Sequence, residues 1–240
     1  MANPNPFLAG LEEKSRERQK EFISHIAGRL GRKPLAEKPQ HPFKGAPSFW
    51  HGFELSEEER IALFMENWRK AGGHAFRLPD GEAVQQFIVE RVEETKARHL
   101  IRQDQEELEN LGLEEALPDV EWTVWGREPK EQLLPMAAGA DIGLVAVDFA
   151  AAYTGSLVVT SSAQKGRSVS LLPTIMIAII PVSRLRTRLG QVLAEFDGKP
   201  REQFPAGIHF ISGPSRSADI ENDLTIGVHG PGIVYALLVG

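Results

Sequence analysis

Small polar residues and glycines gather at three bends in the second half of the chain. These bends cover residues 154–156, 212–221 and 227–232. Glycine lets successive backbone amides point at one spot, and such a nest of amides binds a phosphate or a carboxylate. We therefore expect the three bends to converge on one anion-binding hollow.

The bends contain residues that can hold an anion through hydroxyl groups, backbone amides or positive charge. The ligand-binding candidates are Thr154, Gly155, Ser156, Ser212, Gly213, Ser215, Arg216, Ser217, His229 and Gly230. Arg167 can supply charge to the same anion as Arg216. The pattern assigns no catalytic residue, and the candidates for an acid or a base are His229 and Asp219.

Each bend also has a purely structural interpretation. Glycine at position 155 is the default choice for a tight turn, and "SGPS" by itself is a common turn. His229 follows a predicted strand, where it can act chemically or bond its neighbouring backbone. Asp141 fits the start of a buried strand better than a catalytic base, because a buried carboxylate needs partners. The residue types alone leave these alternatives open.

Several classes of chemistry lack their sequence signals. No nucleophile elbow, P-loop or dinucleotide-binding glycine motif is present. The 7 histidines do not show helical metal-ligand spacing, so no metal site is expected. The chain has no cysteine, which excludes thiolate ligation of iron–sulfur clusters by its own residues. A net charge of −6 without a long basic run gives no nucleic-acid footprint.

Two features predict a cytoplasmic protein without a membrane span. The first residues lack the apolar core of a signal peptide, since "EEKSRERQKEF" follows almost at once. The longest apolar run, "LLPTIMIAIIPV" at residues 171–182, is too short to cross a bilayer and contains prolines. We interpret this run as a buried strand.

The elements that would position the bends alternate between helix and strand. Helices are predicted over residues 8–30, 56–72, 80–97, 104–116, 130–138 and 183–196. Strands are predicted over residues 71–78, 99–102, 120–125, 141–149, 155–161, 174–180, 207–212, 224–228 and 234–240. Several strands are apolar on both faces, which predicts an α/β fold in which helices cover a sheet. Ligands of such sheets bind beyond the carboxyl ends of the strands, so the bends are expected at that edge.

The first part of the chain differs from the rest. We expect residues 1–55 to form an N-terminal helix and a proline-rich extended arm, and residues 56–240 to form the α/β domain. The arm carries aromatic residues, which are unusual in a free linker; they are Phe43, Phe49, Trp50 and Phe53. The arm is therefore expected to dock on its own domain or on another chain; docking on a second copy would give a homo-oligomer.

Four segments, in this order, carry a resemblance to a known family. They are "GADIGLVAVDFAAAYTGSLVV", "SLLPTIMIAIIPVSRL", "FISGPSRSADIE" and "GVHGPG". Together they resemble the lactate-utilisation protein C family, whose shared module is the LUD domain. The resemblance is strongest over residues 118–240. It implies a three-layer α/β/α fold similar to that of sugar-phosphate isomerases, CoA transferases and formyltetrahydrofolate cyclo-ligases, the NagB/RpiA/CoA transferase-like fold.

The resemblance also implies a function. Members of this family take part in the oxidation of L-lactate to pyruvate in bacteria, with two sister proteins that resemble iron–sulfur electron carriers. Because this chain lacks cysteine, the clusters are expected on those partners, with no cofactor on this chain. The chain would then be a non-redox subunit or accessory protein of a lactate-oxidising complex. The alternative is a stand-alone enzyme of the isomerase or cyclo-ligase type that binds a phosphate or carboxylate, with His229 or Asp219 as acid or base.

Overall fold

A computed structural model describes residues 6–34, 52–220 and 223–240 of the chain. Contacts divide the protein into two compact units, Met1–Gly52 and Phe53–Gly240. The first unit contains the helix α1 (Pro6–Arg29), close to the helix predicted over residues 8–30. Most of the predicted arm, including Phe43, Phe49 and Trp50, lies outside the described residues.

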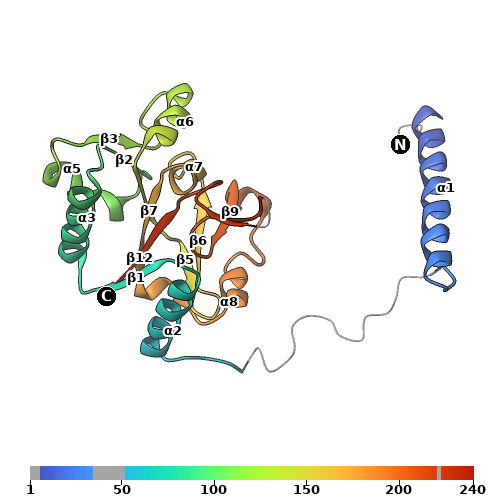
Figure 1. Ribbon diagram of the computed structural model, residues 1–240, viewed down its shortest axis with the longest axis horizontal. Helices are drawn as coiled ribbons and strands as arrows, with labels where there is room; N and C mark the ends of the chain where they lie inside the picture. Colours follow the sequence, from blue (N-terminus) through green and yellow to red (C-terminus); the bar gives the residue numbers. More distant parts are fainter. Residues whose placement is uncertain (1–5, 35–51, 221–222) are drawn as a thin grey trace. The chain divides into compact units, whose positions relative to one another are not determined.

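A 6-stranded sheet forms the centre of the second unit, with strand order β1-β12-β7-β4-β2-β3. All neighbouring strands in it are parallel. The strands are β1 (His74–Leu78), β2 (His99–Arg102), β3 (Glu121–Val124), β4 (Ile142–Ala146), β7 (Ile175–Pro181) and β12 (Ile233–Val239). The predicted α/β class, with a mainly parallel central sheet, is confirmed (Figure 1).

Helices cover this sheet on both faces. The helices of the second unit are α2 (Glu57–Lys70), α3 (Gly81–Thr95), α4 (Glu106–Glu109), α5 (Leu113–Ala116), α6 (Lys130–Gly139), α7 (Arg167–Leu171) and α8 (Leu189–Ala194). Helix α2 begins as the sequence predicts: Ser56 and Glu59 form a capping box in which each side chain accepts a hydrogen bond from the other residue's backbone N–H.

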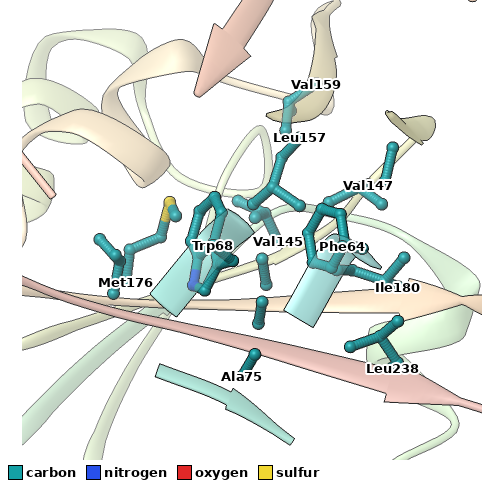
Figure 2. Packing of buried hydrophobic residues seen from close by; sticks show 14 of the residues in the cluster. Phe64, Trp68, Ala75, Val145, Val147, Leu157, Val159, Met176, Ile180 and Leu238 are labelled. Carbon is teal, nitrogen blue, oxygen red and sulfur yellow. The ribbon is translucent and has the colours of Figure 1, made fainter. Parts of the chain in front are cut away.

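Alternate side chains of the central strands enter two separate hydrophobic cores, because successive residues of a strand point to opposite faces. On one face, Ile177 of β7 packs in the cluster formed with α3, α4 and α5. On the other face, Met176 packs in the cluster that contains Phe64 and Trp68 of α2 (Figure 2). Both aromatic side chains of α2 are fully buried, so this helix is fixed on the sheet.

The strands divide between two main sheets, a division that the sequence did not predict. A second, 4-stranded sheet has the order β8-β5-β6-β9. Its strands are β5 (Phe149–Ala151), β6 (Ser156–Ser161), β8 (Leu185–Arg186) and β9 (Gly207–Ile211). A short turn joins β5 to β6, which forces antiparallel pairing because parallel neighbours need a long crossover. This sheet shares the α2 core, and α8 packs on its other face.

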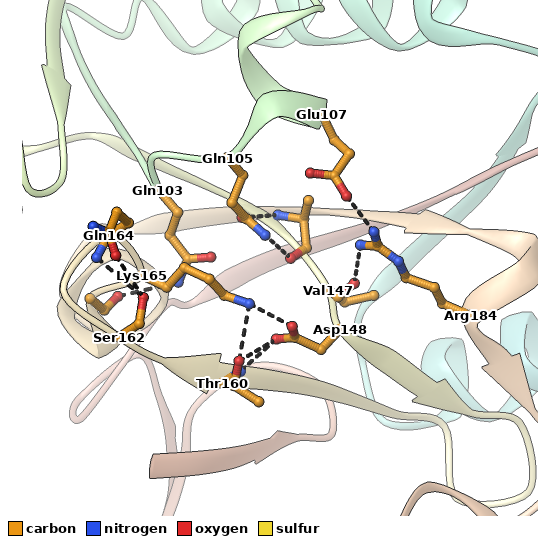
Figure 3. Close-up of polar contacts among 12 residues, drawn as sticks. Gln103, Gln105, Glu107, Val147, Asp148, Thr160, Ser162, Gln164, Lys165 and Arg184 are labelled. Atoms are coloured by element: carbon orange, nitrogen blue, oxygen red, sulfur yellow. Dashed lines mark hydrogen bonds and ion pairs between the residues drawn. The ribbon is translucent and has the colours of Figure 1, made fainter. Parts of the chain in front are cut away.

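The chain crosses between the two sheets at Val147 and Asp148, inside the segment predicted as one strand over residues 141–149. Val147 N–H still donates to Ile179 O of the central sheet, at 3.0 Å, whereas Asp148 N–H donates to Val158 O of the second sheet, at 2.9 Å. The Asp148 carboxylate then accepts hydrogen bonds from Thr160 N at 2.7 Å and from Lys165 Nζ at 2.5 Å (Figure 3). Asp148 therefore fixes the crossing point.

Three other predicted elements differ from the structure. The helix predicted over residues 104–116 is split into α4 and α5, because Gly112 adopts a left-handed conformation with φ of +59°. The helix predicted from residue 183 begins only at Leu189, because Leu185 lies in the edge strand β8 and pairs with β5. Residues 216–220, predicted as part of a bend, form the strand β10 (Arg216–Ile220), which pairs with β11 (Asp223–Ile226), close to the strand predicted over residues 224–228.

Replacing Gly143 in β4 with alanine should destabilise the protein. A Cβ at this position would lie 2.0 Å from the backbone oxygen of Val169 in α7, and backbone cannot rotate away. Overpacking of this kind costs about 1–3 kcal/mol of unfolding free energy, which chemical denaturation would measure. The control is Gly139→Ala, where no atom lies within 4 Å of the added group. Equal stability of the two variants would show that α7 does not pack against β4 in this way.

Candidate functional site

A pocket of about 570 Å³ lies where the second sheet meets the central sheet. Its wall is formed by α7, the starts of β7 and β12, strand β9, the turn after β9 and the turn before β12. The lining residues are Arg167, Ser170, Leu171, Met176, Ile208, His209, Phe210, Ile211, Ser212, Gly213, Pro214, Ser215, Arg216, His229, Gly230, Pro231 and Val234. The volume falls in the range of ligand-binding pockets, roughly 300–1,000 Å³.

The pocket lies at the amino-terminal edge of the central sheet. It contacts Met176 near the start of β7 and Val234 near the start of β12, and these strands run parallel. The bends were predicted at the opposite, carboxyl-terminal edge of the sheet, and this prediction is wrong for the pocket. The reason is that the bend at residues 227–232 precedes β12 and does not follow a strand of the central sheet.

Ser215 joins the second predicted bend to the third. Its N–H donates to Pro231 O at 2.9 Å, and its own backbone oxygen accepts from Gly227 N at 3.0 Å. Its side-chain Oγ accepts a further hydrogen bond from His229 N at 3.2 Å. One serine therefore holds both ends of the bend at residues 227–231 against residue 215.

The first predicted bend reaches this assembly through one contact. Ser156 Oγ lies 2.7 Å from Ser212 Oγ, and either hydroxyl can be the donor. Thr154 and Gly155 do not line the pocket; Gly155 lies against Asn67 and Trp68 of α2. Residues 154–156 therefore support the pocket from outside, whereas residues 212–216 and 229–230 form its wall.

The turn at residues 212–216 is anchored on the end of α2. Gly213 has φ of +85°, and a Cβ there would lie 2.7 Å from Ala71 O, so both conformation and space require glycine. Arg216 lines the pocket and also donates from Nη2 to Ala71 O at 2.5 Å. This second attachment fixes the position of the Arg216 guanidinium at the pocket wall.

Positive and hydrogen-bonding groups dominate the polar part of the wall. Arg167 and Arg216 each supply a guanidinium, and His209 and His229 each supply an imidazole. Among the side chains that the structure describes, no carboxylate lines the pocket, and Arg167 has no ion-pair partner. The arrangement therefore suits an anion, because guanidinium groups bind carboxylates and phosphates through paired hydrogen bonds.

His209 is a pocket residue that the sequence analysis missed. Its Nε2 lies 2.7 Å from Ser161 Oγ on the neighbouring strand β6. Burial, and then the positive charge of Arg167, lower the pKa of the His209 imidazole from its ordinary value. The sequence signal that could have identified His209 is its position as a polar residue inside the otherwise apolar strand "GIHFIS".

The two catalytic candidates from the sequence occupy different places. His229 lines the pocket and is exposed to solvent. Asp219 lies in β10, beside the candidate Ser217, which pairs in register with Thr225 of β11. Ser217 is not among the lining residues. A catalytic role for His229 or Asp219 stays a prediction.

Over residues 6–34, 52–220 and 223–240, no group of 3 or more His, Asp or Glu side chains is close enough to hold a metal ion. None of the helices in this described part of the chain is long and apolar enough to cross a membrane.

The fold and the pocket belong to a known class of protein. The sequence profile of the LUD domain matches residues 61–239, which include both sheets and every pocket residue. The chain belongs to the LUD domain family. Over residues 61–239, this finding confirms the family that the motifs at the bends suggested.

Curated relatives match most of the chain. It is 36% identical over 218 residues to Lactate utilization protein C of Halalkalibacterium halodurans, covering 90% of this chain and 94% of that one. It is 33% identical to Lactate utilization protein C of Shouchella clausii, covering 88% of this chain and 92% of the relative. It is also 29% identical to the uncharacterized protein YkgG of Escherichia coli, covering 88% and 93%.

One solved structure shares the fold. The crystal structure of a DUF162 family protein from Deinococcus radiodurans superposes with a TM-score of 0.53. It is 18% identical, and the alignment covers 78% of this chain and 99% of that chain. This likeness supports the mixed α/β fold. The isomerase-type fold label stays a prediction.

Replacing Ser215 with alanine should loosen the bend at residues 227–231. The variant removes the acceptor of the His229 N–H but keeps both backbone hydrogen bonds of residue 215. A lost hydrogen bond of this kind costs about 0.5–1.5 kcal/mol, so amide exchange at His229 should accelerate by about fivefold. Exchange measured by NMR would test this. Ser217→Ala, in the same hairpin but outside the pocket, is the control, and equal exchange in both variants would contradict the prediction.

Proposed function

We propose that this protein is a non-redox component of a bacterial L-lactate utilisation system that acts with iron–sulfur partner proteins. In this proposal its pocket binds the carboxylate of a small organic acid such as lactate or pyruvate. The relatives named Lactate utilization protein C support the pathway, since each match covers most of both chains. The pocket supports the role in binding.

The observation that carries the proposal is the charge of the pocket wall. Arg167 and Arg216 come from separate elements and line the same hollow, together with Ser212, Ser215 and His229. A carboxylate placed among these groups would gain charge-assisted hydrogen bonds, which are stronger than those between neutral groups. A positively charged ligand would find no compensating carboxylate among the described lining residues.

The cysteine content supports the division of labour with partners. Oxidation of lactate to pyruvate removes two electrons, and iron–sulfur clusters that could accept them are held mainly by cysteine thiolates. This chain has no cysteine. In our proposal the clusters therefore lie on partner proteins, and this chain contributes recognition of the acid or assembly of the complex.

The size of the pocket favours a role in an assembly. A three-carbon acid such as lactate has six non-hydrogen atoms and occupies roughly 180 Å³ if each of them takes the ~30 Å³ of one molecule in liquid water. The pocket holds about 570 Å³, so such an acid alone would leave most of it filled with water. A group from a partner protein, or a larger ligand, would fill the site and exclude that water. Exclusion of water strengthens the electrostatic interactions in a site.

The alternative function is a stand-alone enzyme of the isomerase or cyclo-ligase type. The specific observation in its favour is the presence of two imidazoles, His209 and His229, in a pocket that also carries anion-binding groups. Such groups can transfer protons to a bound substrate. Turnover of a phosphorylated or carboxylated compound by the isolated chain would favour this alternative.

Replacing Arg167 with glutamine should weaken binding of pyruvate and lactate by tenfold or more. Hydrogen bonds to charged groups contribute about 1.5–3 kcal/mol, and Arg167 has no other ion-pair partner among the described residues. Isothermal titration or ligand-induced thermal shifts would measure the loss. Arg98→Gln is the control, because Arg98 is an exposed arginine outside the pocket. Equal affinity of both variants for pyruvate would argue against a carboxylate site at Arg167.

Affinity capture of the tagged full-length chain tests the partners. From bacterial cells grown on lactate, we expect the captured complex to contain cysteine-rich proteins with bound iron and acid-labile sulfide. Capture from cells grown on another carbon source is the control. Recovery of the chain from lactate-grown cells with no iron–sulfur protein would count against the proposed partners, whatever the outcome of the binding measurements.

A further inference from the structure

His209 and Ser161 form a polar pair in a part of the second sheet that is otherwise apolar. The strands β6 and β9 pair antiparallel, with His209 opposite Val159 and Ser161 opposite Gly207. The imidazole Nε2 reaches Ser161 Oγ across this ladder at 2.7 Å. His209 lines the pocket, so the pair connects the sheet to whatever the pocket binds.

The position of the imidazole depends on the glycine two residues earlier. A Cβ at Gly207 would lie 2.8 Å from both Cε1 and Nε2 of His209. The ring therefore lies against the backbone of Gly207, where a larger residue would displace it. The other ring nitrogen, Nδ1, has no hydrogen-bond partner among the described residues and is not among the buried atoms that lack one. It is available to a ligand.

Without a bound anion, the charged groups around His209 are positive. The charged and titratable groups that line the same pocket are Arg167 from α7, Arg216 from β10 and His229 from the segment before β12. Burial and the Arg167 charge both lower the pKa of His209, so the ring is neutral near pH 7. Ser161 faces it as a neutral hydroxyl that accepts or donates.

A bound anion changes this balance. A carboxylate beside Arg167 cancels part of the positive field that disfavours a second charge nearby. A neutral ring that gives Nε2–H to Ser161 would present only a lone pair at Nδ1, which repels a carboxylate. The other neutral tautomer accepts the Ser161 O–H at Nε2 and offers Nδ1–H, but this is a neutral donor, and its hydrogen bond to the anion is weaker than a charge-assisted one. The imidazolium is a donor at both nitrogens, so it can keep Ser161 as acceptor and donate Nδ1–H to the anion.

We propose that an organic anion enters this pocket together with one proton, which His209 takes up from solvent to hold the anion as an imidazolium. The neutral imidazole, the carboxylate and one solvent proton give a paired imidazolium and carboxylate, with no other bond made or broken. This inference rests on the proposed function, namely that the pocket binds the carboxylate of an organic acid. It adds the group that makes binding depend on pH.

The direction of the pH dependence follows from linkage. If bound anion raises the pKa of His209, affinity increases as the pH falls through the pKa of the complex, and it levels off below the lowered pKa of the free protein. Between the two values, affinity changes by at most about tenfold per pH unit for one proton. Above both values, binding takes up no proton.

Calorimetric titration of the full chain with pyruvate tests the inference. Experiments between pH 5.5 and 8.0, in pairs of buffers with different ionisation enthalpies, give the number of protons taken up. We expect uptake that approaches one proton, and stronger binding toward acidic pH. His209→Gln keeps a polar side chain without a titratable group, so it should bind pyruvate with no proton uptake at His209 and a flat pH profile.

Two histidine variants serve as controls. His99 has a similar contact, with Nε2 2.9 Å from Thr123 Oγ1, but it lies on β2 outside the pocket, so His99→Gln should retain proton uptake. His229→Gln changes the other pocket imidazole. Uptake that disappears in His229→Gln but persists in His209→Gln would overturn the assignment to His209.

The outcomes separate this inference from the proposed function. Pyruvate binding by the wild type without proton uptake overturns the role of His209 and leaves carboxylate binding intact. No binding of pyruvate by the wild type overturns both. Where His209→Gln fails to fold, NMR titration of the wild-type His209 imidazole decides: its pKa must rise when pyruvate saturates the pocket, and an unchanged pKa overturns the inference.

Discussion

The passage of the chain between its two sheets is the constraint on which the pocket depends. Val147 completes the central sheet through Ile179, and the next residue, Asp148, begins the second sheet through Val158. The carboxylate of Asp148 fixes this step by accepting hydrogen bonds from Thr160 and Lys165 (Figure 3). Because the second sheet starts here, its strand β9 lines a hollow together with the first residues of β7 and β12.

Hydrogen-bonded loops cover the carboxyl ends of β4 and β2 in the central sheet. Gln105 forms two side-chain hydrogen bonds with the end of β4: Nε2 donates to Ala146 O at 3.0 Å, and Oε1 accepts from Ala146 N at 3.1 Å. The loop before α7 lies over the neighbouring strand end, since Asp104 N donates to Gln164 O at 3.0 Å. A ligand at this edge would have to displace these contacts, whereas the amino edge has open volume.

Local chemistry in the sequence was enough to predict some elements and not others. The apolar run around Ile177 predicted a strand buried on both faces, and the Ser56 capping box predicted the start of α2, because each signal lies within a few residues. The second sheet could not be predicted in this way, since β5 pairs with β8 and β6 with β9, which are segments far apart in the chain. His209 was missed for the same reason, because its partner Ser161 lies on a different strand.

The position of Arg167 shows how a core residue can control the charge of the pocket. Gly143, in the middle of β4, has no side chain, and Val169 O occupies the place where a Cβ would lie. Helix α7 can therefore pack directly on the strand, and this short helix carries Arg167, Ser170 and Leu171 into the pocket wall. A side chain at residue 143 would push the helix outward and move the guanidinium with it. The electrostatic character of the pocket therefore depends on close packing inside the central sheet as well as on the residues that line it.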